Sequence, residues 1–533
     1  MASNIGIDEI LSYEPPDKRA RPSAPAENGH IAKVADVAPA SIDPEELLKA
    51  VEADEAAEPL DENAVKRLVA NLEKRVLRNT EMRIKFADEP TKFMESEVEL
   101  HVCIQELHAL ATMPDLYPLL TEGNALQNLL QMLAHDNTDI AVAVVDLLQE
   151  LTDVDTVEES EQGASVLVDA LVDGRAVPLL VTCVERLNEQ NKDEADGVHN
   201  ALSVIENLLE LRPELADKAH EYGLLLWLLR RVRQKGAFDA NRLYASELLG
   251  VLLQQSDEAK RVLGTKDGID VLLQSLATFK RRDPESADER EFMENLFDCV
   301  CASLMHTPNR QRFLDGEGLQ LMNLMLRERK DSRNSALKVL SYATSGVEGK
   351  HNCEKLVEIL GLRTLFPLFM RTPARAKRKG GHTAKEHEEH VCSVVASLLR
   401  NCSQHSRQRI LSKFTEQEYA KIDRLVELHM RYHGRLLRFV PRAPPDEQLS
   451  EDERYVQRLD AGLFTLQLVD LILADACVNC VHATAVVAHT RKLLQMKGGA
   501  MQQLRDVLSE YVQNLGDDAQ AERKRVTALI DAL

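Results

Sequence analysis

The stretch GNALQNLLQMLAHDNTDIAVAVVDLLQELTD, residues 123–153, decides the fold of this 533-residue chain. An apolar run follows Gly123, and a polar break separates it from a second amphipathic segment that runs from Ile140 to Leu151. Self-similarity at roughly 40 to 47 residues, with two or three helices per unit, is typical of armadillo and HEAT repeats. Five further copies of this two-helix pattern open at glycines spaced 43 to 51 residues apart, namely Gly174, Gly223, Gly268, Gly318 and Gly361.

One such unit cannot bury its apolar face alone, so the units are predicted to stack into an all-α, right-handed armadillo/HEAT-like α-solenoid. Aromatic residues make up only 4% of the chain and there is one tryptophan, which favours Leu, Ala and Val packing between helices. We expect four regions: a disordered tail over 1–58, an N-terminal helical cap over 59–120, armadillo-like repeats over 121–402, and C-terminal helical repeats or a cap over 403–533.

Both predicted caps divide into helices. In the N-terminal cap we expect helices over 60–77 and 93–120, with an ordered loop or turn within 83–97. In the C-terminal region the helices are expected over 416–433, 453–480, 483–496, 500–514 and 520–532.

The charge of the chain restricts its partners. Acidic residues number 87 against 65 basic ones, giving a formal net charge of −22. Such a field repels phosphate backbones and attracts basic segments, so we expect no direct binding of nucleic acid. The first residues lack the pattern of a signal peptide and no apolar run approaches eighteen residues, so we expect no membrane contact. Nine cysteines without a framework spacing predict a reducing compartment and no disulfides.

The second helix of each copy is predicted to line the concave groove of the solenoid, and it carries acids at helical spacing. Two interpretations stay open: these acids only keep a helical face solvated, or they form a groove for a basic, extended or helical partner segment. The candidate groove residues are Asp146, Glu150, Asp153, Glu206, Glu210, Glu291, Glu294 and Asp298.

No motif for catalysis is present. The chain lacks a GxSxG elbow, a phosphate-binding GxxxxGK[ST] loop and a GxGxxG turn, and its acid pairs recur with the repeat. His382, His387, His390 and Cys392 are close in sequence but miss the HExxH spacing of a zinc site. Cys477 and Cys480, followed by His482, end an apolar helix and are interpreted as buried structural thiols. We therefore predict a protein that is not an enzyme and that uses no metal or cofactor.

Two basic segments interrupt the acidic sequence. Lys18, Arg19 and Arg21 form a short cluster that is either a nuclear localisation signal or a solvated charge patch. Residues 375–379, within an insertion of the sixth copy, form either a surface loop or a second localisation or docking segment.

Several longer motifs resemble the beta-catenin-like family of nuclear armadillo proteins, and the similarity runs from about residue 60 to the C-terminus. The Ala- and Pro-rich tail departs from the family form. The motifs that carry the resemblance are RIKFADEPTKFMESE (83–97), ATMPDLYPLL (111–120), AHDNTDIAVAVVDLLQELTDVDT (134–156), EADGVHN (194–200), GEGLQLMNLMLRE (316–328), GLRTLFPLFM (361–370), KEHEEHVCS (385–393) and RLDAGLFTLQ (458–467).

This resemblance implies a nuclear, non-enzymatic scaffold in pre-mRNA splicing. It implies association with the spliceosome through the nineteen complex and contact with the basic localisation segment of the Myb-like cell-division-cycle-five splicing factor. In vertebrates the family is also linked to the antibody-diversifying cytidine deaminase. A homodimer through the C-terminal helices is left open.

The alternative is a nuclear transport carrier for basic cargo. Armadillo import adaptors share the repeat architecture but read basic signals with repeated Trp and Asn side chains on their inner helices. The one tryptophan of this chain, Trp227, is expected on an earlier helix of its repeat, which disfavours that mechanism.

Overall fold

N-capping residues set the start of the long helices. Asn137 accepts a backbone hydrogen bond from Asp139 at the beginning of α7 (Thr138–Leu151). Asn191 does the same from Asp193 for α11 (Lys192–Leu211). A side-chain oxygen at this position satisfies an amide that has no partner inside the helix, so the sequence fixes where each helix begins.

The structure is a computed structural model that describes residues 61–159, 161–373, 383–441 and 449–533. Residues Leu60–Leu533 form one unit, and the fold is described within it. Every regular element among the described residues is helical, which confirms the predicted all-α class.

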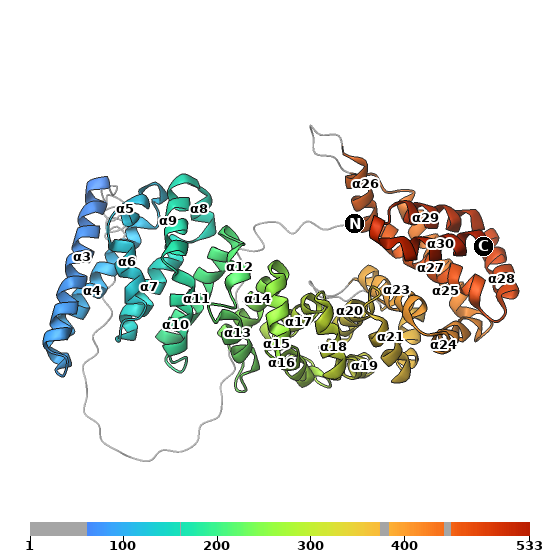
Figure 1. Ribbon diagram of the computed structural model, residues 1–533, viewed down its shortest axis with the longest axis horizontal. Coiled ribbons are helices and arrows are strands. Elements are labelled where there is room, and N and C mark those ends of the chain that lie inside the picture. Colours follow the sequence, from blue (N-terminus) through green and yellow to red (C-terminus); the bar gives the residue numbers. More distant parts are fainter. Residues whose placement is uncertain (1–60, 160, 374–382, 442–448) are drawn as a thin grey trace, which may run out of the picture. The chain divides into compact units, whose positions relative to one another are not determined.

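A further helix precedes the glycine that opens each copy, so the repeats contain three helices, except that in the second repeat two helices, α8 and α9, take the first position (Figure 1). The first helices are α5 (Pro118–Thr121), α8 (Val154–Glu159) with α9 (Glu161–Asp173), α12 (Leu215–Lys218), α15 (Asp257–Thr265), α18 (Thr307–Asp315) and α21 (Lys350–Glu358). The second helices are α6 (Ala125–Met132), α10 (Ala176–Arg186), α13 (Leu224–Arg233), α16 (Gly268–Leu276), α19 (Gly318–Glu328) and α22 (Leu362–Met370). The third helices are α7, α11, α14 (Ala240–Gln255), α17 (Ala287–Ser303), α20 (Arg333–Thr344) and α23 (Ala384–Asn401).

Two of the repeated glycines, Gly318 and Gly361, allow the first and second helices of their repeats to meet closely. A Cβ at Gly318 would lie 2.3 Å from Cε2 of Phe313, and one at Gly361 would lie 2.4 Å from Cδ1 of Leu356. The left-handed backbone of these junctions belongs to the preceding residues, Glu317 with φ 59° and Leu360 with φ 63°. Glycine is therefore needed here for space, not for its conformational freedom.

The third helices pack on one another in chain order, from α4 (Met94–Glu106) through α7, α11, α14, α17, α20 and α23 to α27 (Phe464–Asn479). Their Leu, Val, Ile and Ala side chains form the core; Leu147, Leu202 and Leu248, for example, are fully buried. Burial of a Leu or Ile side chain contributes about 1.5–3 kcal/mol, so contact with the next repeat stabilises each unit.

The N-terminal helices differ from the prediction. Helix α3 (Glu62–Lys85) continues into the segment 83–97 that was expected as a loop, and α4 already begins at Met94. The expected helix over 93–120 is broken by short turns, η2 (Leu107–Leu110) and η3 (Pro114–Leu116), because Pro114 cannot continue a helix.

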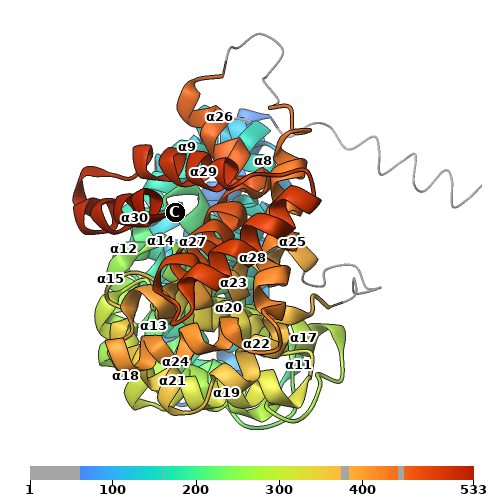
Figure 2. The ribbon, with the colours of Figure 1, turned by 90° about the vertical axis from the view of Figure 1, so that its right-hand side faces the viewer.

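The C-terminal helices continue the stack (Figure 2). Helix α27 packs on α23 as a third helix does, and also contacts α25, α28, α29 and α30. The bounds in this region are α24 (Gln404–Thr415), α25 (Ala420–Leu436), α26 (Glu451–Arg458), η5 (Leu459–Leu463), α28 (Ala483–Met496), α29 (Met501–Gln513) and α30 (Gln520–Ala532).

One helical run in the described residues, Glu451–Asn479, has the length and composition of a membrane span. In its apolar window 83% of the residues are buried inside the fold, which is the environment of a core helix.

Candidate acidic groove

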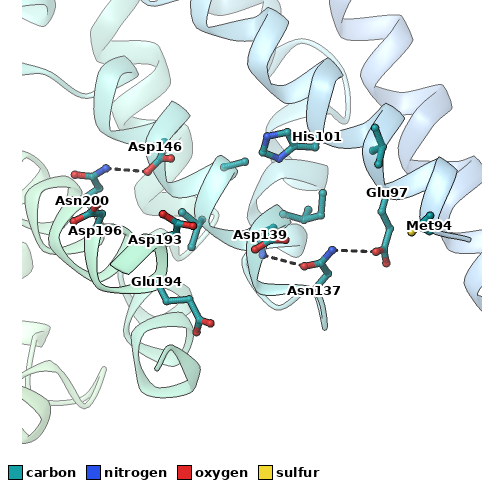
Figure 3. Close-up of a pocket in the computed structure, with 14 residues that line it drawn as sticks. Met94, Glu97, His101, Asn137, Asp139, Asp146, Asp193, Glu194, Asp196 and Asn200 are labelled. Carbon is teal, nitrogen blue, oxygen red and sulfur yellow. Dashed lines mark hydrogen bonds between the residues drawn. The ribbon is translucent and has the colours of Figure 1, made fainter. Parts of the chain in front are cut away.

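A groove of about 730 Å³ lies between three successive helices of the stack, α4, α7 and α11 (Figure 3). Its lining residues are Met94, Glu97, Val98, His101, Asn137, Asp139, Ile140, Val142, Ala143, Asp146, Asp193, Glu194, Asp196 and Asn200.

The groove is strongly acidic. Its lining includes six carboxylates and no lysine or arginine. Three of them, Asp139, Asp193 and Glu194, lie in the first turns of α7 and α11, where the helix dipole stabilises negative charge. The capped helix starts therefore present acids to the same groove from neighbouring repeats.

Half of these acids already have structural partners. Glu97 pairs with Arg83 and accepts a 3.0 Å hydrogen bond from Asn137. Asp146 accepts a 2.8 Å hydrogen bond from Nδ2 of Asn200, and Glu194 accepts the backbone N–H of Asn188 at 2.8 Å.

The other three acids are Asp139, Asp193 and Asp196, whose side chains form no hydrogen bond or ion pair within the described part of the chain. These three carboxylates are therefore available to pair with a basic ligand. An unpaired charge facing an open groove supplies long-range attraction for a ligand of the opposite sign.

Asp146 is the most buried of the aspartates in the groove. Burial raises the pKa of its carboxyl, and the hydrogen bond from Asn200 offsets this effect only in part. Repulsion from Glu150 and Asp196 raises the pKa further. A cation placed in the groove would relieve that repulsion.

The floor of the groove is apolar. Met94 and Val98 lie one turn apart on α4 and are 60% and 59% exposed, and Ile140, Val142 and Ala143 face them from α7. Single exposed apolar side chains are common, but here they adjoin one another at the edge of a groove, and such a patch is typical of an interaction site. Acidic walls over an apolar floor fit a segment that carries both basic and apolar side chains.

Of the acids predicted from sequence, only Asp146 lines this groove. Four others connect neighbouring elements of the stack. Glu150 contacts His108 at 2.7 Å, Glu206 accepts from Tyr244 at 2.5 Å, Glu294 accepts from Ser335 at 2.7 Å, and Asp298 pairs with Lys338 at 2.6 Å.

The three remaining predicted acids have different positions. Glu210 and Glu291 are exposed on α11 and α17. Asp153 was expected on the second helix of its copy, but α7 ends at Leu151; Asp153 instead accepts hydrogen bonds from Thr156 in α8. It therefore caps the next helix.

Sequence reasoning missed Asp139, Asp193 and Asp196. The signal available for the first two is the recurrence of Asn-x-Asp at 137–139 and 191–193, directly before two amphipathic helices. It also missed Glu247 on α14, whose pKa is raised by burial and then by repulsion from Glu206 and Glu291. Acidic side chains therefore continue along α11, α14 and α17 beyond the groove.

The clusters considered for chemistry serve the core. Nε2 of His387 lies 3.3 Å from the carbonyl of Leu368, Cys392 is fully buried, and Cys477 contacts Thr490. Within the described ranges, no three or more His, Cys, Asp or Glu residues are arranged to hold a metal ion. All nine cysteines are free and buried. Four predicted features lie outside the described residues: the tail over 1–58, the cluster Lys18, Arg19 and Arg21 within it, His382, and the loop 375–379.

Trp227 lies on α13, the second helix of its repeat, where it is 7% exposed. This placement agrees with the sequence prediction. Its indole packs in the core instead of lining the groove.

Comparison with known proteins identifies the family. Residues 43–509 match the model of the family described as "Catenin-beta-like, Arm-motif containing nuclear". The chain is 54% identical to beta-catenin-like protein 1 of Bos taurus and 53% identical to that of Homo sapiens, in each case over 489 residues covering 89% of this chain and 86% of the relative. It is 32% identical to the beta-catenin-like protein 1 homolog of Schizosaccharomyces pombe, with 91% and 84% covered. The chain therefore belongs to the beta-catenin-like family of nuclear armadillo-motif proteins.

Proposed function

We propose that this chain is a non-enzymatic nuclear scaffold that holds a basic segment of a partner protein in the groove between α4, α7 and α11. The observation that carries the proposal is the lining of the groove, with six carboxylates, no lysine or arginine, and an exposed apolar floor. Such a surface complements a segment in which basic and apolar side chains alternate or share a helix face.

The partner that the family resemblance favours is the basic localisation segment of the Myb-like cell-division-cycle-five splicing factor. The scaffold would then act in pre-mRNA splicing, within the spliceosome-associated nineteen complex. The charge of the groove supports this choice, because a localisation segment is rich in Lys and Arg.

The energetics require several acids to act together. A single exposed ion pair contributes only about 0–1 kcal/mol, so one carboxylate cannot capture a segment. Three acids without partners, backed by the charge of Glu97, Asp146 and Glu194, attract a multiply basic segment from a distance and raise its association rate. Burial of Met94 and Val98 would add an apolar contribution that salt does not screen.

The test is fluorescence anisotropy of the labelled basic segment with the full chain, at low and physiological salt. The variant Asp193→Lys with Asp196→Lys reverses two acids at the second and fifth positions of α11. The matched control, Asp288→Lys with Glu291→Lys, reverses acids at the same two positions of α17, outside the groove.

We expect the groove variant to weaken binding by about tenfold or more at low salt and the control to change it much less. Equal losses in both variants would reduce the interaction to general charge attraction. A loss in the α17 control alone would move the site along the stack.

A further inference from the structure

A second pocket has the opposite charge. It has a volume of about 650 Å³ and lies where α22, the start of α20 and the α24–α25 junction meet. Its lining holds six cations and one carboxylate, in a protein with 22 more acids than bases. The cations are Arg329, Arg333, Arg363, Arg371, Lys413 and Lys421.

The two lysines share the single carboxylate of the pocket. Glu416 accepts from Lys413 at 2.8 Å and lies 3.5 Å from the buried Nζ of Lys421. The side chains of the four arginines form no hydrogen bond or ion pair with any residue that the structure describes. Four guanidinium groups therefore face one cavity without a counter-charge.

Arg333 shows the cost of this arrangement. Its Nε is buried and has no hydrogen-bond partner, and burial together with the charge of Arg329 lowers the pKa of its guanidinium. A buried donor without a partner is destabilising, and more so when it is charged. The fold thus holds a position that an anion would stabilise.

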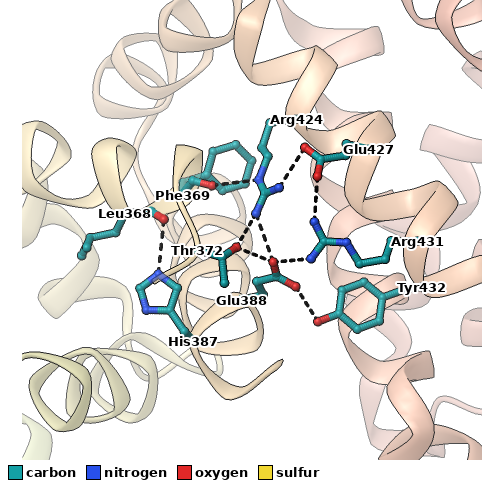
Figure 4. Close-up of polar contacts among 9 residues, drawn as sticks. All are labelled: Leu368, Phe369, Thr372, His387, Glu388, Arg424, Glu427, Arg431 and Tyr432. Atoms are coloured by element: carbon teal, nitrogen blue, oxygen red, sulfur yellow. Dashed lines mark hydrogen bonds and ion pairs between the residues drawn. The ribbon is translucent and has the colours of Figure 1, made fainter. Parts of the chain in front are cut away.

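Two other arginines near the pocket, Arg424 and Arg431, pair with carboxylates (Figure 4). Arg424 and Arg431 bind the buried carboxylate of Glu388 at 3.0 and 2.6 Å, and both also bind Glu427. Arg424 also donates to Thr372, which lines the pocket, at 2.5 Å. The arginines that connect the helices therefore form ion pairs with carboxylates, whereas the four arginines that line the cavity do not.

Backbone geometry around the pocket is strained. Arg329 has φ 58°, and three consecutive residues between α24 and α25, Gln417, Glu418 and Tyr419, have φ of 53°, 53° and 66°. Side chains other than glycine rarely adopt this conformation. The same backbone conformation occurs singly at repeat junctions such as Glu317 and Leu360, whereas here three consecutive residues adopt it, which the surrounding fold must hold in place.

We propose that this basic pocket binds a ligand with clustered phosphate groups. Arginine forks match phosphate oxygens in pairs, and four of them can neutralise several negative charges within one cavity. A long nucleic-acid strand fits less well, because it would extend from the pocket over a chain of strongly acidic composition. The same phosphate chemistry is available from a small polyphosphate or from a protein segment with neighbouring phosphoserines.

Isothermal titration calorimetry of the full chain with tripolyphosphate tests the site. Arg363→Gln with Arg371→Gln removes two exposed, unpaired arginines of the pocket, so these changes should leave the fold intact. The matched control, Arg327→Gln with Arg409→Gln, removes two exposed arginines from α19 and α24 that do not line the pocket. It causes the same change in net charge.

We expect the pocket variant to weaken binding by about tenfold or more and the control to change it by less than about twofold. A second arm uses a serine–glycine peptide with two phosphoserines beside its unphosphorylated form. Binding of tripolyphosphate identifies a small polyphosphate as the ligand type, and binding of the phosphopeptide alone identifies a modified protein segment.

Three results would overturn the proposal. The first is that neither tripolyphosphate nor the phosphopeptide binds. The second is that the pocket variant and the control variant bind the probe equally well. The third is that a single-stranded RNA oligomer binds more tightly than either probe, through the same arginines. Because the acidic groove shares no residue with this pocket, the groove experiment and this one can fail independently.

Discussion

Asp146 on α7 accepts a 2.8 Å hydrogen bond from the side-chain amide of Asn200 on α11, across the interface of two neighbouring repeats. The same carboxylate lines the acidic groove. One side chain therefore joins two repeats and contributes to the field that would attract a basic partner. The two roles can be separated, because the hydrogen bond needs only an acceptor oxygen, whereas the attraction needs the charge.

Asp146→Asn should separate them. The pKa of Asp146 is raised in the folded chain, first by burial, so its ionisation opposes folding once the pH exceeds the unfolded pKa of about 3.9. The asparagine keeps an acceptor for Asn200 and lacks the charge. We expect an equal or higher Tm at pH 7, no gain at pH 3, and weaker binding of the basic segment, measured by thermal denaturation and anisotropy. A Tm that falls at pH 7 would show that the charge itself holds the repeats together.

Asp298→Asn provides the contrast for this prediction. Asp298 forms an ion pair with Lys338 at 2.6 Å, and the substitution leaves that lysine without its counter-charge. This variant should have a lower Tm at pH 7, by an amount equivalent to about 1 kcal/mol or less, because the pair is partly exposed.

The Glu388 network should make the C-terminal part of the stack sensitive to acid. Burial would raise the pKa of Glu388, but hydrogen bonds from Thr372, Tyr432 and Arg431 outweigh it and hold the pKa below its usual value. Its stabilising contribution is therefore present above the unfolded pKa of about 4.3 and is lost as the pH falls through the lower folded pKa.

Glu388→Gln should lower the free energy of unfolding by about 1.5–3 kcal/mol at pH 7, because it removes the buried charge that Arg424 and Arg431 share, although Glu427 still pairs with both. The matched control is Glu427→Gln. Glu427 contacts the same two arginines but its side chain is 50% exposed, so we expect a loss of about 1 kcal/mol or less. Urea denaturation at pH 7 distinguishes the two variants. Equal losses in the free energy of unfolding would show that the burial of Glu388 does not increase its contribution to stability.

Much of the fold follows from patterns that a single chain displays. The helices predicted over 483–496, 500–514 and 520–532 are confirmed as Ala483–Met496, Met501–Gln513 and Gln520–Ala532. They could be predicted because apolar residues recur at helical spacing between clear breaks. The first helices of the repeats were missed. Some, such as Leu215–Lys218, are only one turn long and show no periodicity, whereas longer ones such as Asp257–Thr265 carry a helical pattern that could have been found.

For the groove, the sequence predicted the negative charge but, apart from Asp146, not the residues that line it. Helical spacing identifies which acids share a face, but it does not show which of them are satisfied by the next repeat, as Glu206 is by Tyr244. The contribution of α4 was also missed, because Glu97 and Val98 lie outside the repeated pattern and reach the groove only through stacking.

Neighbouring residues at the α21–α22 junction should respond in opposite directions. Gly361→Ala places a Cβ 2.4 Å from Cδ1 of Leu356 and should destabilise the fold by about 1–3 kcal/mol. Leu360→Gly removes an exposed side chain at φ 63° and should be neutral or stabilising by up to about 1 kcal/mol. Chemical denaturation of both variants checks the order, and a greater loss in Leu360→Gly would contradict the packing role assigned to Gly361.

Trp227 offers a test between a scaffold and a carrier that reads its cargo with tryptophan. It is the single tryptophan of the chain and is buried on α13, away from the groove. Saturating amounts of a tryptophan-free basic segment should leave the wavelength and intensity of its emission unchanged. A blue shift or quenching that follows the binding curve would favour direct contact with Trp227 and the carrier mechanism.

The decisive measurement is a double-mutant cycle across the groove and its partner. The native chain and the Asp193→Lys, Asp196→Lys variant are each titrated with the native basic segment and with a segment in which two lysines are replaced by glutamate. If the groove holds the segment, each change alone weakens binding and the two together restore much of it, with a coupling energy of about 0.5–3 kcal/mol. If the two losses simply add, these acids do not face the segment, and the groove between α4, α7 and α11 is not its binding site.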